Sequence, residues 1–130
     1  MVLVILLASS MLLNSGHGQG DASKDGPDPC ANSATEADML RCRHQEFADS
    51  ESEVDGLYQQ LMNSYAKDEP GLHPLLQQAQ VAWRDYRDAQ CRVDTYYSAS
   101  GSAYETYWLQ CLAKTNAARA LQLEWLLESP

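Results

Sequence analysis

Residues 74–111 read PLLQQAQVAWRDYRDAQCRVDTYYSASGSAYETYWLQC, and this stretch decides the fold. Apolar and aromatic residues recur every three or four positions on both sides of the short Ser/Gly segment 98–102, which predicts two amphipathic helices joined by a turn. Cys91 lies ten residues before Gly101, and Cys111 lies ten residues after it. With Gly101 at the apex of an antiparallel helical hairpin, the two sulfur atoms face each other, so we expect a Cys91–Cys111 disulfide.

Each of these two helices has a predicted core-facing seam with alternating steps of three and four residues. In the first helix, expected to begin at Pro74 as a first-turn residue, the seam is Leu76, Ala79, Trp83, Tyr86, Gln90, Val93 and Tyr97. In the second helix it is Tyr104, Trp108, Cys111, Thr115, Ala118, Gln122 and Trp125, flanked by Leu112, Leu121 and Leu126.

A third helix is predicted before these two. Its apolar residues Leu40, Phe47, Val54 and Leu61 recur every seven positions. Thr35 or Ser33 is the expected N-cap, and Glu69-Pro70-Gly71 is the expected end. The sequence contains no alternating run of β-branched residues, so no strand is predicted. Short connections between long amphipathic helices favour antiparallel neighbours, so the sequence predicts an all-α fold, a small disulfide-stapled antiparallel three-helix bundle.

The N-terminal region is typical of an exported protein. Residues 1–13, MVLVILLASSMLL, are apolar and shorter than the ~20 residues that span a bilayer, and residues 14–20 are small or polar. This pattern predicts a signal peptide over 1–20, although no basic residue precedes the apolar run; a buried N-terminal helix is the alternative. Residues 21–29, DASKDGPDP, are predicted to be a flexible polar leader. No cysteine directly follows the apolar run, so we expect no lipid anchor and a periplasmic or secreted protein.

Four cysteines in a small exported domain predict two disulfides. With Cys91 and Cys111 paired across the hairpin, Cys30 and Cys42 are the second expected pair. A metal site is the alternative, because Cys42 is close to His44 in the sequence. Since the cysteine spacing does not match a zinc module, we expect no metal and no other cofactor.

The charge restricts the class of partner. The chain has 130 residues, with 18 acidic and 9 basic side chains and a formal net charge of −9. One domain fits this length, and the acidity argues against nucleic acid or an anionic membrane surface as partner. Residues 21–69 hold 12 of the acidic side chains and 4 of the basic ones. The candidate partner-binding residues are Asp49, Glu51, Glu53 and Asp55 in this acidic half, with Ser100 and Ser102 in the turn; a solvated helix face is the alternative for the acidic residues.

Motifs that would indicate catalysis are missing from the sequence. It contains no Gly-rich phosphate loop, no Gly-x-Ser-x-Gly elbow and no His-Glu-x-x-His helix. Its carboxylate pairs have the spacing of solvated helix faces. We therefore expect no catalytic residue and no enzymatic activity.

Two motifs resemble those of a known family. The Cys30-x11-Cys42 segment and the run Leu76-x-x-Ala79-Gln80-x-x-Trp83-x-x-Tyr86-Arg87-Asp88-x-x-Cys91, followed by Gly101 and Cys111, resemble the LprI-like domain of bacterial exported proteins, which is named for the lysozyme inhibitor LprI. The resemblance covers residues 30–127.

The resemblance implies an exported, disulfide-bonded helical domain without enzymatic activity that binds a protein, with lysozyme as the named partner. The alternative is a periplasmic envelope or stress interaction module that has no effect on lysozyme. We interpret the residues of the family signature as structural, with Trp83 filling the seam and Arg87 and Asp88 bonding loop backbone or helix ends; the others are Gln80, Tyr86 and Gly101.

Overall fold

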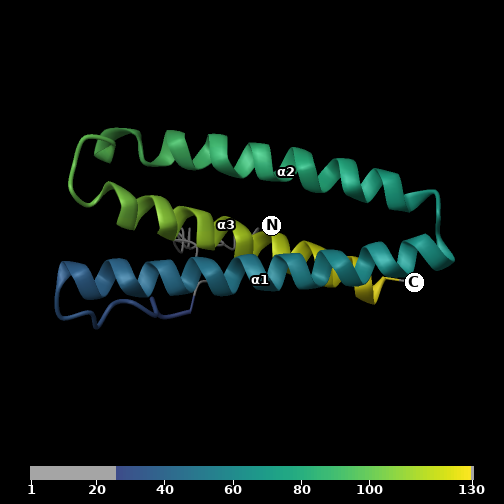
Figure 1. Ribbon diagram of the computed structural model, residues 1–130, viewed down its shortest axis with the longest axis horizontal. Coiled ribbons are helices and arrows are strands. Elements are labelled where there is room, and N and C mark those ends of the chain that lie inside the picture. The colour runs from purple at the N-terminus through teal and green to yellow at the C-terminus, as the bar shows by residue number, and fades with distance from the viewer. Residues whose placement is uncertain (1–25, 130) are drawn as a thin grey trace, which may run out of the picture.

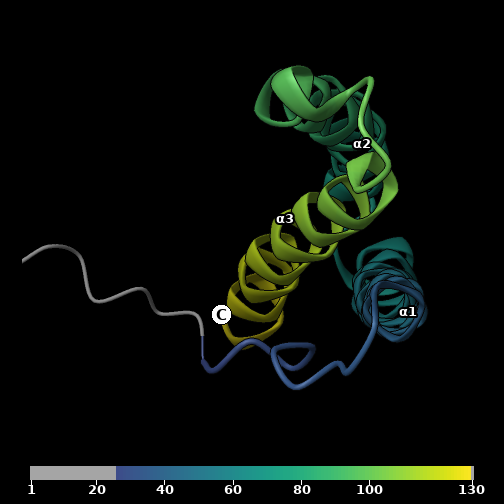
Figure 2. The ribbon, with the colours of Figure 1, turned by 90° about the vertical axis from the view of Figure 1, so that its left-hand side faces the viewer.

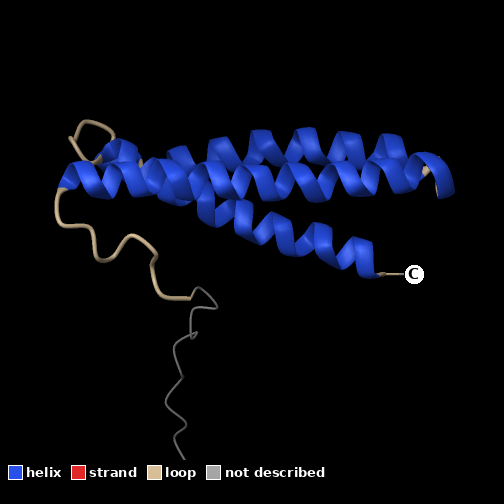
Figure 3. Cartoon of the chain, turned by 60° about the horizontal axis from the view of Figure 1, so that its bottom comes forward, coloured by secondary structure: helices blue, strands red, loops and turns tan. Residues whose placement is uncertain are grey.

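The computed structural model describes residues 26–129, and these form three long helices. They are α1 (Glu36–Asp68), α2 (Leu72–Asp94) and α3 (Tyr104–Glu128), with one 3-10 turn, η1 (Tyr96–Ser98), between the last two. Figure 3 shows only helix and loop in this part of the chain. The prediction of an all-α antiparallel three-helix bundle is confirmed. The predicted signal peptide and residues 21–25 of the predicted leader lie outside the described residues.

The start of α1 has the capping interaction that the sequence predicts. Thr35 is extended, and its hydroxyl oxygen accepts a hydrogen bond from the backbone N–H of Asp38 at 3.1 Å. Glu36 and Asp38 add negative charge at the positive end of the helix dipole. Of the two predicted N-caps, Thr35 is therefore the one that is used.

The second helix begins two residues earlier than expected. Leu72 is its first residue, and Pro74 occupies the third position. A proline is tolerated there because the N–H groups of the first turn have no partner within the helix.

The helices pack unequally. Figure 1 shows α3 close beside α1, with α2 at the edge of the bundle, and Figure 2, which looks along α1, shows α3 inclined to it. Buried side chains from all three helices form the core, and they are Val54, Leu61, Leu76, Ala120 and Leu123. These residues lie toward the end of the molecule where α1 passes into α2.

The predicted seam of α1 is right at its centre, since Val54 and Leu61 are fully buried. In α2 the buried residues are Leu76, as the seam predicted, and also Gln80, Arg87 and Cys91, which were not part of that seam. The predicted positions Ala79, Tyr86, Val93 and Tyr97 are exposed and were wrong.

The predicted seam of α3 was wrong in its second half, although Leu112, predicted to flank it, is buried. Its buried residues are Leu109, Leu112, Ala113, Asn116, Ala120 and Leu123, whereas Ala118, Gln122 and Trp125 are exposed. The buried residues of α2 and α3 include the polar residues Gln80, Arg87 and Asn116. A prediction from apolar periodicity assigns such residues to the surface.

Both predicted disulfides are confirmed. Cys30 bonds to Cys42 and Cys91 bonds to Cys111, with S–S distances of 2.02 and 2.05 Å. Both bonds lie at the end of the bundle where α1 and α3 begin and α2 ends. The covalent links therefore lie in one half of the molecule, beside buried Leu109, Leu112 and Ala113, while the cluster around Leu61, Leu76 and Leu123 lies toward the other end.

Candidate partner-binding surface

The loop between α2 and α3 is held in one shape by internal hydrogen bonds. The buried Thr95 side chain donates from Oγ1 to the Cys91 carbonyl at 2.6 Å, and Ser98 Oγ donates to the Thr95 carbonyl at 2.9 Å. The Gly101 N–H donates to the Ser98 carbonyl, also at 2.9 Å. A Cβ atom on Gly101 would lie 3.3 Å from that carbonyl oxygen, which is closer than ordinary contact. With the Cys91–Cys111 disulfide at its base, the loop is a rigid projection.

We call residues 95–103 the tip. Its aromatic side chains are exposed, with Tyr97 98% accessible to solvent, and the rings of Tyr96 and Tyr97 meet edge to face at 5.4 Å between centroids. Ser100, Gly101 and Ser102 are also exposed. Exposed tyrosines among small polar residues are the composition of protein-binding loops, because a tyrosine offers a large contact area at a low cost in conformational entropy. The structure therefore places the predicted serines beside two tyrosines. Tyr97 had been predicted to lie in the core-facing seam, and Tyr96 had been given no role.

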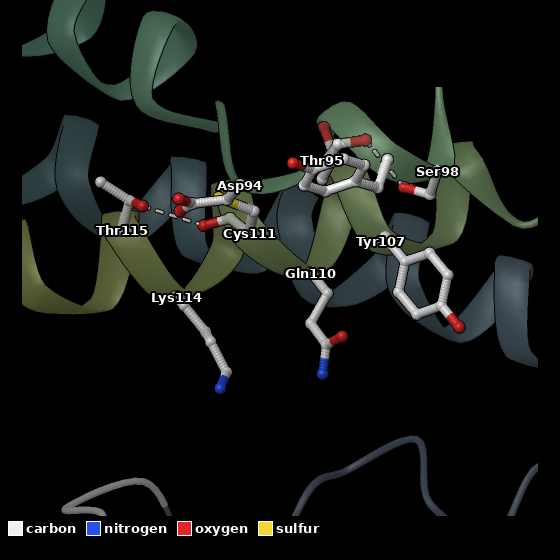
Figure 4. A pocket seen from close by; sticks show the side chains of 9 residues that line it. Asp94, Thr95, Ser98, Tyr107, Gln110, Cys111, Lys114 and Thr115 are labelled. Atoms are coloured by element: carbon white, nitrogen blue, oxygen red, sulfur yellow. Dashed lines mark hydrogen bonds between the residues drawn. The ribbon is translucent and has the colours of Figure 1, made fainter. Parts of the chain in front are cut away.

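A pocket of about 550 Å³ lies beside the tip (Figure 4). Thr95, Tyr97 and Ser98 line it from the tip, and Tyr107, Gln110 and Lys114 project together from one side of α3. A second pocket, of about 660 Å³, shares Tyr107 and Gln110 and is also lined by Ser102. The tip and this face of α3 therefore form one uneven surface with a hollow on each side of Tyr107.

The N-terminal segment 26–35 forms the outer wall of the second pocket. Asp28 accepts a hydrogen bond from the buried Arg43 guanidinium at 2.7 Å, and Cys30 is tied to Cys42. The Arg43 guanidinium, followed by the Cys30 backbone N–H, holds the pKa of Asp28 below its ordinary value. The described end of the predicted leader is thus fixed to α1 by an ion pair and a disulfide.

The four predicted acidic residues do not form one face. Asp49 and Glu53 are exposed, and Asp49 accepts from the Gln45 amide at 2.8 Å. Glu51 turns inward, toward α2, and accepts from Arg84, from Arg87 and from Asn116 of α3. Asp55 is exposed but also pairs with Arg84. Glu53 lies about 20 Å further along α1 than Met39, which lines the pocket beside Ser102. The serines and the acidic residues are therefore separate parts of the surface.

Opposing effects act on the pKa of Glu51. Burial raises this pKa, but the hydrogen bond from Arg84, the charge of Arg87 and the hydrogen bond from Asn116 together lower it below the ordinary value. Glu51 is therefore held as a carboxylate at neutral pH, and its charge is used inside the bundle.

Glu51 of α1, Arg87 of α2 and Asn116 of α3 bond to one another inside the bundle, and we call them the polar layer. Residues of the family signature take part in it. Arg87 is buried, pairs with Glu51, donates to Asn116 Oδ1 at 3.0 Å and donates from Nε to Asp88 at 2.8 Å. Contacts to loop backbone or helix ends had been predicted for Arg87, and the structure shows these cross-helix contacts in their place. Asp88 accepts the Nε bond from its neighbour Arg87 on the same helix. The prediction had missed Asn116, although an Asn within an apolar helical line indicates a buried hydrogen bond.

Trp83 lies beside this layer. It is partly buried against the core, and three guanidiniums surround its ring, with those of Arg87, Arg119 and Arg84 at 5.3, 5.7 and 6.0 Å from the centroid. Gln80 is also buried and accepts from Arg119 Nε at 3.1 Å. By contrast, Tyr86 is 59% exposed and contributes nothing to the core.

Two features are absent from residues 26–129. Within that range, no group of three or more His, Cys, Asp or Glu side chains could hold a metal ion. No helix in the same range has the length and apolar character needed to cross a membrane. Disulfides persist in oxidising compartments, so the two in this chain indicate a protein that functions outside the cytoplasm.

Comparison with known proteins assigns the family. Residues 30–123 match the model of the family described as lysozyme inhibitor LprI. An uncharacterized protein of Rhizobium meliloti (strain 1021) is 25% identical over 119 residues, an alignment that covers 83% of this chain and 86% of the relative. No solved structure matches. The family match covers both disulfides, the polar layer and the tip, and the chain belongs to the lysozyme inhibitor LprI family.

Proposed function

We propose that this chain is an exported, non-enzymatic inhibitor that binds a cationic lysozyme through the tip. The observation that carries the proposal is the rigid, tyrosine-bearing projection, in a chain that belongs to a family of lysozyme inhibitors. The signal peptide predicted over 1–20 would deliver the protein to the compartment where lysozyme acts.

The distribution of charge supports insertion of the tip into a lysozyme cleft. The chain has a net charge of −9, which attracts a cationic enzyme over a distance and speeds the encounter. Residues 95–104, TYYSASGSAY, contain no charged side chain. A glycosidase cleft is lined by two catalytic carboxyl groups. An uncharged tip can approach them without like-charge repulsion, and its Tyr and Ser hydroxyls can donate hydrogen bonds to them.

The acidic residues of α1 have a different role in this proposal. Asp49 and Glu53 lie far along α1 from the tip, so they act through the long-range field and not by direct contact in the cleft. At 0.1 M salt this attraction is largely screened beyond a Debye length of about 10 Å. Their removal is therefore expected to slow association, with little effect on dissociation.

The test is lysozyme turnover measured with increasing amounts of the protein purified after export. Tyr97→Ala is expected to weaken inhibition by about tenfold or more, because a fully exposed tyrosine is an anchor of the kind that dominates interfaces. Trp125→Ala is the matched control, since Trp125 is an exposed aromatic residue at the other end of the bundle and its removal should leave inhibition unchanged. The double variant Asp49→Lys/Glu53→Lys should lower the association rate and its dependence on salt.

Two results would contradict the proposal. One is no inhibition at micromolar excess against several lysozyme types, which would favour the envelope interaction module with another partner. The other is equal loss of inhibition in Tyr97→Ala and Trp125→Ala. A pull-down from periplasmic extract with lysozyme as competitor distinguishes the two partners.

A further inference from the structure

The outer side of α2 has an apolar stripe that no residue among 26–129 covers. Its members follow alternating steps of four and three residues, and they are Leu75, Ala79, Ala82, Tyr86, Ala89 and Val93. All six are exposed, with Leu75 59% and Val93 68% accessible. We call this line the α2 stripe. Such spacing is typical of a seam between two helices.

The α2 stripe is separate from the face by which α2 joins its own bundle. Leu75, Ala79 and Tyr86 each precede a buried residue by one position, so the two lines are about 100° apart around the helix. Figure 2 shows α2 at the edge of the molecule, with α3 on one side of it only. A second helix can therefore pack on the stripe without displacing α1 or α3.

The sequence of the stripe fits a second α2 helix running antiparallel. With a two-fold axis between residues 87 and 88, Tyr86 lies opposite Ala89 of the second copy, and Val93 lies opposite Ala82 of the second copy. Both of these large side chains thus meet a small one, which is how facing positions fill space without clashes. Leu75 lies outside the overlap of the two helices in this register.

The charges beside the stripe fit the same register. Asp85 and Arg92 flank it on one side, seven residues apart, and neither has an ion-pair partner within the described chain. In the antiparallel register, Asp85 of each copy lies near Arg92 of the other, so the pair forms twice. The segment 72–94 also has three Asp and three Arg residues, and it is neutral in a chain of net charge −9. It is therefore a face on which two acidic molecules can meet with little repulsion.

We propose that the occupant of the α2 stripe is a second copy of this chain, in an antiparallel, two-fold symmetric dimer. An interface of this kind is isologous, so the same patch serves both partners. The proposal is independent of whether the tip binds lysozyme.

Sedimentation velocity from about 5 µM to about 500 µM tests the proposal, because a weak dimer converts to monomer on dilution. Asp85→Arg and Arg92→Asp each place like charges at two symmetric positions, and each is expected to raise the dimer dissociation constant by about tenfold or more. The double variant Asp85→Arg/Arg92→Asp restores both pairs in reversed order and should recover the wild-type dissociation constant. Glu53→Arg, which changes the net charge as Asp85→Arg does but lies on α1, is the matched control and should have no effect.

A second variant tests the apolar contact. Tyr86→Glu puts two charges at the centre of the stripe and should abolish the dimer, while circular dichroism shows wild-type helix because the residue is exposed. Wild-type protein that stays monomeric throughout the concentration range would overturn the proposal. A dimer that the double charge swap fails to restore would overturn it as well.

Discussion

Arg87 is the residue on which the three helices depend most. It is buried on α2, pairs with Glu51 of α1 and donates to Asn116 of α3. Removing one member of such a pair leaves the other carrying an uncompensated charge. Arg87→Met is therefore expected to lower the free energy of unfolding by about 3 kcal/mol, as measured by urea denaturation.

The control for this prediction is Arg41→Met. Arg41 forms an ion pair with Asp38 on the surface of α1, and loss of an exposed pair costs under about 1 kcal/mol. Equal destabilisation by the two variants would show that the buried pair contributes no more than a surface one.

Glu51 makes stability depend on pH. Its pKa is lower in the folded protein than the ordinary value of 4.5, because the contacts from Arg84, Arg87 and Asn116 outweigh burial. A carboxylate with a lowered pKa contributes stability that is present above pH 4.5 and lost as the pH falls through the folded-state pKa. We expect Glu51→Gln to be less stable than wild type at pH 7 and to lose less stability on acidification, as measured by urea denaturation at a series of pH values.

Glu53→Gln removes a carboxylate from the same helix at an exposed position. It should keep the acid sensitivity of the wild type. Parallel stability curves for wild type and Glu51→Gln would disprove the role assigned to Glu51.

At the scale of single elements, α1 has one replaceable weak position. Gly56 is exposed in the interior of the helix, and a Cβ atom there would meet nothing within 4 Å. Since glycine in a helix interior costs about 1 kcal/mol relative to alanine, Gly56→Ala should raise the free energy of unfolding by roughly this amount. Gly101→Ala is the contrasting variant, because its Cβ would crowd the Ser98 carbonyl, and it should give no gain.

The buried face of each helix could be predicted only where apolar residues make up that face. The core line of α1 has Val54 and Leu61, and a seven-residue apolar repeat predicts it directly. The buried line of α2 contains Gln80 and Arg87, whose burial depends on partners supplied by other helices. An apolar pattern therefore assigned Tyr86 and Val93 to the core, although both are exposed.

The candidate site was less predictable than the helices, for a related reason. Ser100 and Ser102 could be identified from the turn composition, and the spacing of Cys91 and Cys111 about Gly101 predicted the disulfide below them. The exposure of Tyr97 depends on where α2 ends and the 3-10 turn begins. That boundary is set by the Thr95 side chain, which bonds back to the helix, and not by periodicity.

At the scale of the whole molecule, the two disulfides provide a test that separates stability from shape. Cys91–Cys111 and Cys30–Cys42 close loops with sequence separations of 20 and 12 residues, so each is expected to stabilise the fold by about 3 kcal/mol on the chain-entropy model. Only the first anchors the tip. We expect Cys91→Ala/Cys111→Ala and Cys30→Ala/Cys42→Ala to be destabilised to a similar degree by urea denaturation, while the first loses much more inhibition of lysozyme. Equal losses of inhibition would indicate that the tip needs no anchor.

The placement of both covalent links in one half of the molecule also determines how it comes apart. One half, with the tip and both disulfides, is held by bonds that a thiol reductant breaks in addition to buried side chains of α3. The other half, around Leu61, Leu76 and Leu123, is held by contacts that a chaotrope weakens. Amide hydrogen exchange should therefore reveal two distinct opening reactions. A reductant releases residues 26–35 and 95–103 first, whereas dilute guanidinium frees the junction of α1 and α2 while the tip keeps its shape.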